Sequence, residues 1–118
     1  MLAPVLCSST DSKLRAVVLT VTGPLTTHDH IAGLLHTLSV VPRGFSLIIE
    51  MDTMTTLSTA GLRGLRDLAK TAIDGGVRLV IVSESLDVRA NLILSDLDSL
   101  APILHTLAQA RMVVAAAA

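Results

Sequence analysis

The chain has 118 residues, of which 51% are hydrophobic and 16% are charged, and its formal net charge is −1. A chain of this length predicts one domain around a single core. The near-neutral charge, together with one Phe and neither Tyr nor Trp, argues against the basic, base-stacking surface of a nucleic-acid-binding protein.

The first residues predict a β-hairpin. Residues 1–7 are expected to form a short strand, and the polar residues 8–13 are expected to form the turn that follows it. Residues 14–22 (LRAVVLTVT) are rich in β-branched side chains, so they predict a second strand that pairs with the first. Gly23 and Pro24 end this strand.

A helix is predicted next. Thr27 is placed as its N-cap, and Asp29 lies in the first turn, where a carboxylate is favourable. The predicted helix runs from His28 to about Ser39 and is followed by a turn at residues 42–44. Its apolar stripe consists of Ile31, Leu34, Leu35 and Leu38.

The middle of the chain predicts the strand and helix around which the rest is organised. Residues 45–51 (FSLIIEM) are almost wholly apolar, which is typical of a strand buried on both faces. The period then becomes helical, and Gly75 and Gly76 suit the end of the helix because glycine readily takes a positive φ. Residues 57–61 (LSTAG) form the turn between them. The helical stripe consists of Leu62, Leu65, Leu68, Ala69, Ala72 and Ile73.

The last third of the chain continues the alternation of strands and helices. Ser85 is expected to cap a short helix, and Pro102 is typical of an edge strand. The four terminal alanines are expected to fray. The predicted elements are a buried strand at 77–82, a helix to about 94, a turn at 96–99, a short strand at 100–104 and a helix from 105 or 106 to about 113.

This order predicts a single α/β domain spanning residues 1–118. Strands that alternate with helices favour a mainly parallel sheet, and the opening hairpin makes it mixed. We expect about five strands and about four helices, with the core at about 14–110 and a frayed tail at 114–118. No apolar run approaches the roughly 20 residues that a membrane span requires, so membrane insertion is not expected.

Cysteine and histidine give no pattern of metal ligands. Cys7 is the only cysteine, so neither a disulfide nor a thiolate cage is expected, and a reducing cytoplasm is the expected compartment. His28 and His30 are two residues apart, which on a helix separates them by about 200°, so both are expected to be solvated. His36 and His105 have no acidic or cysteine neighbours at ligand spacing. No metal or cofactor is predicted.

Enzymatic chemistry is not predicted either. Ser58, Asp52 and one of the four histidines supply the residue types of a hydrolytic triad, but the G-x-S-x-G elbow is absent. A phosphate-cradling loop is also missing, because Gly61 and Gly64 lie inside the predicted helix.

Ser58 and Thr59 remain as the candidate functional residues. One of the two hydroxyls is expected to cap the helix, which is worth about 1 kcal/mol. The other is then free at the positive end of the helix and available to a kinase, whose phosphate would add about 1.5 to 2 negative charges. The helix N-terminus tolerates an anion, so the phosphate would not disturb the fold. A partner docked over the same turn would have to remove water from the phosphate, which opposes binding. The site therefore suits a switch of association.

Residues 47–65 (LIIEMDTMTTLSTAGLRGL) resemble the signature of STAS domains, in particular stand-alone bacterial anti-sigma factor antagonists. In that family a buried strand runs into a DSSGL-like turn and then the helix that carries the phosphorylated hydroxyl. Residues 21–26 (VTGPLT) and 75–82 (GGVRLVIV) are similar to two further family segments. Residues 83–97 and 100–110 match its later helices and strand, so the resemblance covers about 14–110.

The resemblance implies both a function and a site. It places Thr59 on the phospho-acceptor, with Ser58 as the alternative, while Ser58 and Thr26 replace acidic residues. Unmodified, the domain would bind a kinase-like anti-sigma factor and release the sigma factor; phosphorylation by that partner would end binding, and a phosphatase would restore it. The expected partner-binding residues are Thr26, Thr27, Thr56, Ser58, Thr59 and Arg63.

Two other interpretations stay open. One is a STAS module without phosphorylation that regulates a transporter as a separate subunit. The other is a dimerising scaffold domain, because the apolar composition leaves room for a buried homodimer interface.

Overall fold

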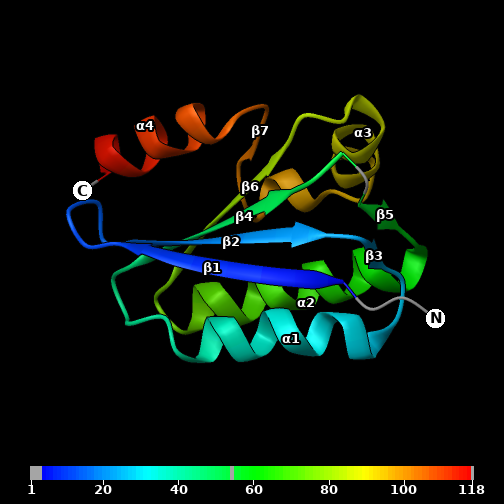
Figure 1. Cartoon of the computed structure of the whole chain (residues 1–118), viewed down its shortest axis with the longest axis horizontal. Coiled ribbons are helices and arrows are strands. Elements are labelled where there is room, and N and C mark those ends of the chain that lie inside the picture. The colour runs from blue at the N-terminus through cyan, green and yellow to red at the C-terminus, as the bar shows by residue number, and fades with distance from the viewer. Residues whose placement is uncertain (1–3, 54, 118) are drawn as a thin grey trace.

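A five-stranded sheet forms the centre of the molecule (Figure 1). The structure is a computed structural model that describes residues 4–53 and 55–117, with the backbone alone described at Ala117. The strand order is β1-β2-β4-β6-β7. β1 pairs antiparallel with β2, and the other neighbours are parallel, so the predicted mixed, mainly parallel sheet is confirmed. The strands are β1 (Val5–Asp11), β2 (Ala16–Thr22), β4 (Ser46–Met51), β6 (Arg78–Ser83) and β7 (Ile103–Leu104).

Helices lie on both faces of the sheet. α1 (His28–Ser39) and α2 (Thr59–Asp74) lie side by side on one face, and α4 (Leu107–Ala117) covers the other (Figure 1). α3 (Leu86–Leu94) and the 3-10 turn η1 (Leu97–Ser99) pack into the same core as α1 and α2. Of the helices in the described ranges, none has the length and apolar character that crossing a membrane requires.

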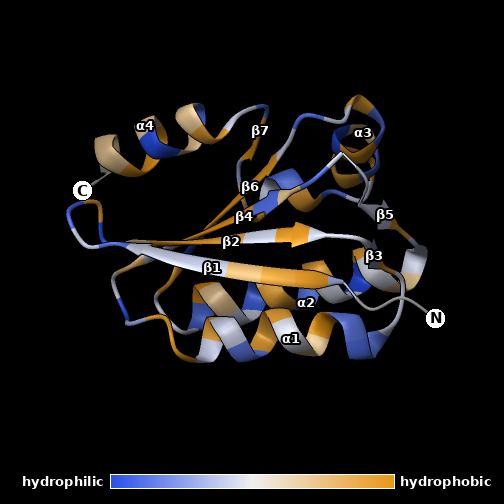
Figure 2. Cartoon of the chain, in the orientation of Figure 1, coloured by the Kyte–Doolittle hydropathy of each residue, from blue (hydrophilic) through white to orange (hydrophobic). Residues whose placement is uncertain are grey.

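The alternation of side chains along the strands builds two cores, because successive residues of a strand point to opposite faces. In β4, Leu47 and Ile49 face the larger core under α1 and α2. Ile48 between them faces the smaller core, where Ala110 and Val114 of α4 pack. Figure 2 shows β4 and β6 as almost continuously hydrophobic, which is the pattern expected of strands covered on both faces.

The predicted helix boundaries are largely confirmed. α1 begins after Thr27, whose Oγ1 accepts a hydrogen bond from the His30 N–H at 3.3 Å. α2 ends at Asp74, and Gly76 takes a φ of 72°, which favours glycine. Ser85 caps α3 by accepting from the Val88 N–H at 3.3 Å.

The prediction of a turn at residues 8–13 is wrong for residues 8–11. β1 continues through Asp11, and its antiparallel register runs from Val5 opposite Thr22 to Asp11 opposite Ala16. The pairing with β2 outweighs the polar character of the segment, since an edge strand tolerates exposed polar side chains. The turn begins after Asp11, whose Oδ1 accepts from the main-chain N–H groups of Lys13 and Leu14, both at 3.1 Å.

The end of the last helix also differs from the prediction. α4 was expected to stop near Val113, with fraying at 114–118, but it runs to Ala117. Alanine has the highest helix propensity of the amino acids, and Val114 is held in the smaller core. The remaining alanine, Ala118, lies outside the described residues.

The apolar stripes of two helices are narrower than predicted. Leu35 of α1 and Ile73 of α2 are 40% and 52% exposed. Each helix contacts the core along one stripe, so apolar residues at the margin of that stripe stay in contact with solvent.

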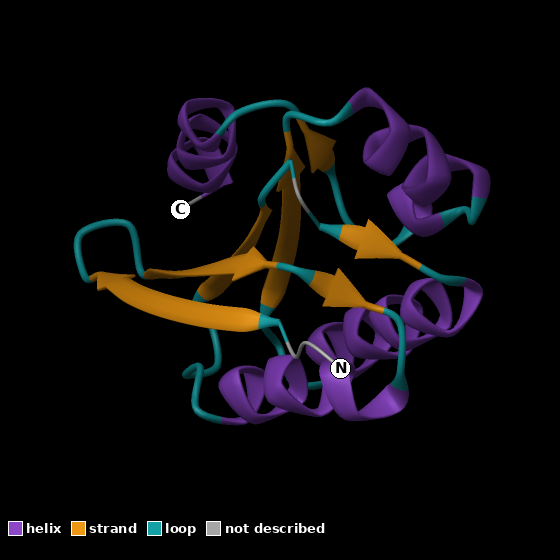
Figure 3. Cartoon of the chain, turned by 45° about the vertical axis from the view of Figure 1, so that its right-hand side comes forward, coloured by secondary structure: helices purple, strands orange, loops and turns teal. Residues whose placement is uncertain are grey.

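A second, two-stranded parallel sheet was not predicted. β3 (Pro24–Leu25) pairs with β5 (Thr56–Leu57) beside the carboxyl end of β4 (Figure 3). Pro24 was expected only to end a strand. Proline has no backbone N–H to donate to a neighbouring strand, but it is tolerated as the first residue of a strand, which is its position in β3. This small sheet positions the candidate site.

Candidate functional site

The β3–β5 pair brings the first turns of α1 and α2 to the same end of the molecule (Figure 1). Pro24 lies opposite Thr56, and Leu25 lies opposite Leu57. The N-caps of the two helices come directly after these strands. Thr27, the N-cap of α1, is the second residue after β3, and Ser58, the N-cap of α2, is the first residue after β5. The hydroxyl residues that are far apart in the sequence are therefore neighbours in the fold.

Ser58 is the N-cap of α2, and its hydroxyl both donates and accepts a hydrogen bond. Its backbone is extended, with φ −101° and ψ 173°. The Oγ atom accepts from the Gly61 N–H at 3.1 Å and donates to the Thr26 carbonyl oxygen at 3.0 Å. One hydroxyl thus satisfies an orphan donor of the helix and ties the helix to the end of β3.

Thr59 is the first residue of α2, and its side chain is exposed. It makes no side-chain hydrogen bond with any other residue in the described ranges. Of the two hydroxyls between which the sequence left the choice open, Ser58 caps the helix and Thr59 faces solvent. The expected turn at residues 57–61 is shorter than predicted, because the helix begins at Thr59.

Two glycines of α2 allow this close packing. A Cβ atom on Gly61 would collide with the carbonyl oxygen of Leu25, and one on Gly64 would collide with the side chain of Ile31. Both glycines are buried. They let α2 approach the backbone of β3 and the side chains of α1, so that Ser58 comes within hydrogen-bond distance of Thr26.

His30 is a member of the site that the sequence interpretation missed. The prediction that His28 and His30 are both solvated is wrong for His30, which is 8% exposed, whereas His28 is exposed. The Thr26 N–H donates to His30 Nδ1 at 3.1 Å. His30 lies one residue before Ile31 and four before Leu34, which extends the buried stripe of α1. This spacing was the signal that could have identified it.

Thr26 lies between the two helix starts. Its carbonyl oxygen accepts from Ser58 and its N–H donates to His30. Because the N–H is the donor, Nδ1 of His30 acts as an acceptor and the ring proton belongs on Nε2. Thr26 is therefore held by both helices through its main chain.

Thr55 is a second residue that was missed. It is 4% exposed, and its Oγ1 donates to the Val21 carbonyl oxygen at 3.1 Å. The Asp52 N–H donates to that same carbonyl at 2.9 Å. Together they tie the segment after β4 to the end of β2. The sequence carries no periodic signal for Thr55, because it lies in an irregular segment.

The remaining predicted residues, Thr56 and Arg63, are exposed. Arg63 follows Thr59 by four residues in α2, so the two side chains lie on the same side of the helix. The first turn of α2 contains no acidic residue, which leaves the positive end of the helix uncompensated by its own side chains. Within the described part of the chain, no cluster of three or more His, Cys, Asp or Glu residues could hold a metal ion.

The fold and the site together define the class: a single small α/β domain that presents hydroxyl side chains at one end of a mixed sheet. The STAS domain family model matches residues 9–110, and the chain belongs to the STAS domain family. STAS domains are typically non-enzymatic regulatory modules that mediate protein–protein interactions. A comparison with curated proteins gives no significant match.

Proposed function

We propose that this chain is an anti-sigma factor antagonist that is switched off by phosphorylation of Thr59. In its unmodified form it binds a kinase-like anti-sigma factor in the cytoplasm and so frees the sigma factor. The domain itself catalyses nothing. The observation that carries the proposal is the contrast between two adjacent hydroxyls: that of Ser58 makes two hydrogen bonds with the main chain, and that of Thr59 is exposed.

The modification transfers the γ-phosphoryl group of ATP to Thr59 Oγ1. The bond between the γ-phosphorus and the bridging oxygen breaks, the bond between Oγ1 and phosphorus forms, and ADP leaves. The proton of the hydroxyl passes to a base of the partner. Hydrolysis by a phosphatase restores the hydroxyl and releases inorganic phosphate.

The domain is built to accept this phosphate without unfolding. The phosphate would sit at the N-terminal end of α2, where the helix dipole and the unpaired N–H groups favour an anion. The first turn of α2 has no carboxylate to repel it. Arg63 is exposed one turn further on, at the spacing that allows an ion pair with a charged group at position 59.

The same phosphate would oppose docking of a partner over this end of the sheet. The proposed docking surface surrounds Thr59, so an added dianion would have to lose its water when the partner binds. Arg63, once paired with the phosphate, would no longer be available to an acidic group of the partner. The surface consists of Thr26, Thr27, Thr56, Ser58, Thr59 and Arg63.

Incubation with candidate kinase-like anti-sigma factors and ATP, read by intact mass, tests the proposal. We expect a gain of one phosphate that is lost in Thr59→Ala and kept in Thr71→Ala, a control because Thr71 is an exposed threonine of α2 outside the proposed docking surface. Binding should weaken in Thr59→Glu. Phosphate gained by Thr59→Ala would place the acceptor elsewhere, and failure of every candidate partner to bind would refute the antagonist role.

A STAS module that docks without phosphorylation is the second candidate. Ser58 stands where the resemblance places an aspartate, and its hydroxyl is used for capping and for the contact with Thr26. Tight binding of a partner with no change in mass would favour this candidate over the phosphorylation switch.

A further inference from the structure

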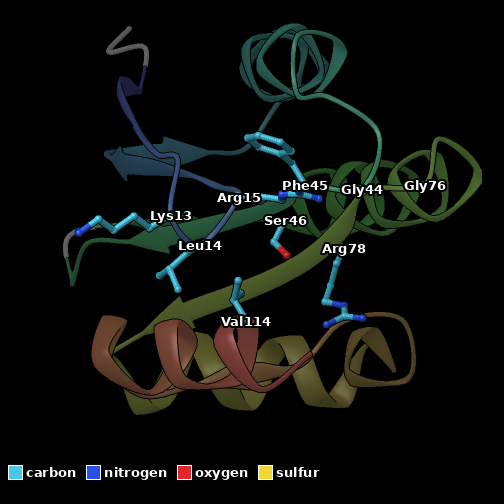
Figure 4. Close-up of a pocket in the computed structure, with 9 residues that line it drawn as sticks. All are labelled: Lys13, Leu14, Arg15, Gly44, Phe45, Ser46, Gly76, Arg78 and Val114. Atoms are coloured by element: carbon cyan, nitrogen blue, oxygen red, sulfur yellow. The ribbon is translucent and has the colours of Figure 1, made fainter. Parts of the chain in front are cut away.

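An open cleft of about 460 Å³ lies at the other end of the sheet, where the parallel strands begin (Figure 4). The residues that line it come from the β1–β2 turn, the loops before β4 and β6, and the last turns of α4. It is separated from Thr59 by the length of the strands.

The cleft is cationic. Lys13, Arg15 and Arg78 line it, and no Asp or Glu is among its described lining residues. Arg43 adds a fourth positive charge nearby, because its side chain lies over Gly76, another lining residue. The whole chain carries a formal net charge of −1, so the concentration of positive charge here is local.

Two polar side chains, those of Ser46 and Arg78, lie side by side on neighbouring strands at this edge, and Arg15 directly precedes the strand on the other side of Ser46. Ser46 of β4 is paired with Ala16 of β2 on one side and Arg78 of β6 on the other. The Ser46 N–H donates to the Arg15 carbonyl oxygen at 2.9 Å. Because neighbouring strands are about 4.8 Å apart, the Ser46 hydroxyl and the Arg78 side chain can contact one small anion, and Arg15 lines the same cleft. Figure 4 shows the two arginines on either side of Ser46.

The Ser46 hydroxyl is the second indication of a ligand. Ser46 is 7% exposed, yet its hydroxyl makes no hydrogen bond within the described part of the chain. Among the described residues, every fully buried side-chain polar atom has a hydrogen-bond partner. The Ser46 hydroxyl oxygen has none, so it must be accessible to solvent. Figure 4 shows it pointing into the cleft on the side of Val114. It is a donor that a ligand can use.

Arg15 is held in a costly backbone conformation. Its φ is 51°, in the left-handed region that glycine and asparagine adopt more readily than a long side chain. The turn would be at least as stable with glycine or asparagine at this position. The strained backbone therefore indicates a function for the arginine side chain.

We propose that this cleft binds a phosphorylated small molecule. Three cationic side chains without a lining carboxylate favour a dianion such as a phosphate monoester over a single carboxylate. Arg15, Arg78 and the Ser46 hydroxyl bind the phosphate. The apolar part of the ligand lies against Leu14 and Val114, which line the same cleft and belong to the smaller core.

A purely structural role for the cations makes the opposite prediction. α2 and α4 end near this edge, and positive charge near a helix C-terminus offsets the negative end of its dipole. If that were the role of Arg15, replacing it would lower stability. If the role is binding, Arg15→Asn should relieve the strained backbone and keep or raise the melting temperature while it removes the ligand contact.

Titration of the full chain with phenyl phosphate, followed by amide chemical shifts, tests the site; inorganic phosphate and benzyl alcohol probe the two halves of the ligand separately. We expect saturable shifts at Arg15, Ser46 and Arg78, with tighter binding of phenyl phosphate than of either half. Arg15→Asn and Arg78→Gln should each weaken binding roughly tenfold, and Ser46→Ala should weaken it several-fold.

Lys70→Gln is the matched control, because it removes one exposed positive charge from α2 outside the cleft and should leave the affinity unchanged. The absence of saturable binding of phenyl phosphate to the wild-type chain would overturn the proposal. So would equal affinities in wild type and Arg15→Asn, or an equal loss in Lys70→Gln, which would indicate non-specific attraction by net charge.

Discussion

The two ends of the central sheet use their polar groups differently. At the carboxyl end, Ser58 and His30 are bound to main-chain groups of Thr26. At the amino end, Arg15 and Ser46 face an open cleft. The first set of hydrogen bonds fixes how helices and strands meet, so its loss should cost stability. The side chains of Arg15 and Ser46 make no hydrogen bond with another residue that the structure describes, so their loss should weaken ligand binding instead.

The two ends also differ in charge. A cleft of about 250 Å³ at the carboxyl end is lined by Glu50, Asp52 and Glu84 and by no Lys or Arg among the described residues. The cleft at the amino end is lined by Lys and Arg and by no Asp or Glu. Although the net charge of the chain is near zero, the two clefts carry opposite charge. The cleft at the amino end favours anionic ligands, and the cleft at the carboxyl end favours cationic ligands or partners.

Gly61→Ala should have the largest effect on stability, because it disrupts the packing of α2 at the carboxyl end of the sheet. The added Cβ collides with the Leu25 carbonyl oxygen, so we expect a loss of about 3 kcal/mol of unfolding free energy in urea, although alanine favours a helix by about 1 kcal/mol over glycine. Gly75→Ala at the other end of α2 is the control, because its Cβ would lie 3.4 Å from the nearest atom. Equal losses would contradict the comparison.

His30→Leu should cost somewhat less. It leaves the Thr26 N–H without its acceptor, and an unpaired donor in a mostly buried position costs about 2 kcal/mol. His28→Leu, two residues earlier and exposed, should leave the urea midpoint almost unchanged. A large effect of the His28 variant would show that the histidines act together, contrary to their different burial.

Ser58→Ala separates the two adjacent hydroxyls. It removes the cap of α2 and the link to Thr26, and we expect a loss of about 1 kcal/mol. Thr59→Ala should change the unfolding free energy by less than about 0.5 kcal/mol, because its side chain is exposed. If Thr59→Ala were the more destabilising variant, Thr59 rather than Ser58 would be the structural hydroxyl.

Arg78→Gln should have the smallest effect on stability and so sharpen the contrast between the ends. Arg78 is exposed at the start of β6, and surface substitutions of this kind usually change the unfolding free energy by less than about 0.5 kcal/mol. Thermal unfolding without added phosphate measures it. A loss comparable to that of Ser58→Ala would indicate that the amino end is also held by its side chains.

Much of the architecture could be read from local patterns. The buried run at residues 45–51 and the helical stripe from Leu62 define β4 and α2 because each pattern repeats with the period of its own structure. The caps Thr27 and Ser85 were identified because a short hydroxyl side chain directly before an apolar period is a local signal. The small β3–β5 sheet was missed because a two-residue strand has no period at all.

The sequence by itself determined the order of strands and helices, the mixed sheet and the presence of two hydroxyls at the start of α2, because these depend on side-chain periodicity and capping chemistry within a short stretch of chain. Only the tertiary structure decided which of the two hydroxyls caps the helix and which one faces solvent. Thr26 lies 32 residues from Ser58 in the sequence, and their contact requires the pairing of β3 with β5 and the close approach of Gly61. The same holds for His30, whose burial follows from where α1 packs. Contacts between distant segments follow from packing, which local patterns do not encode.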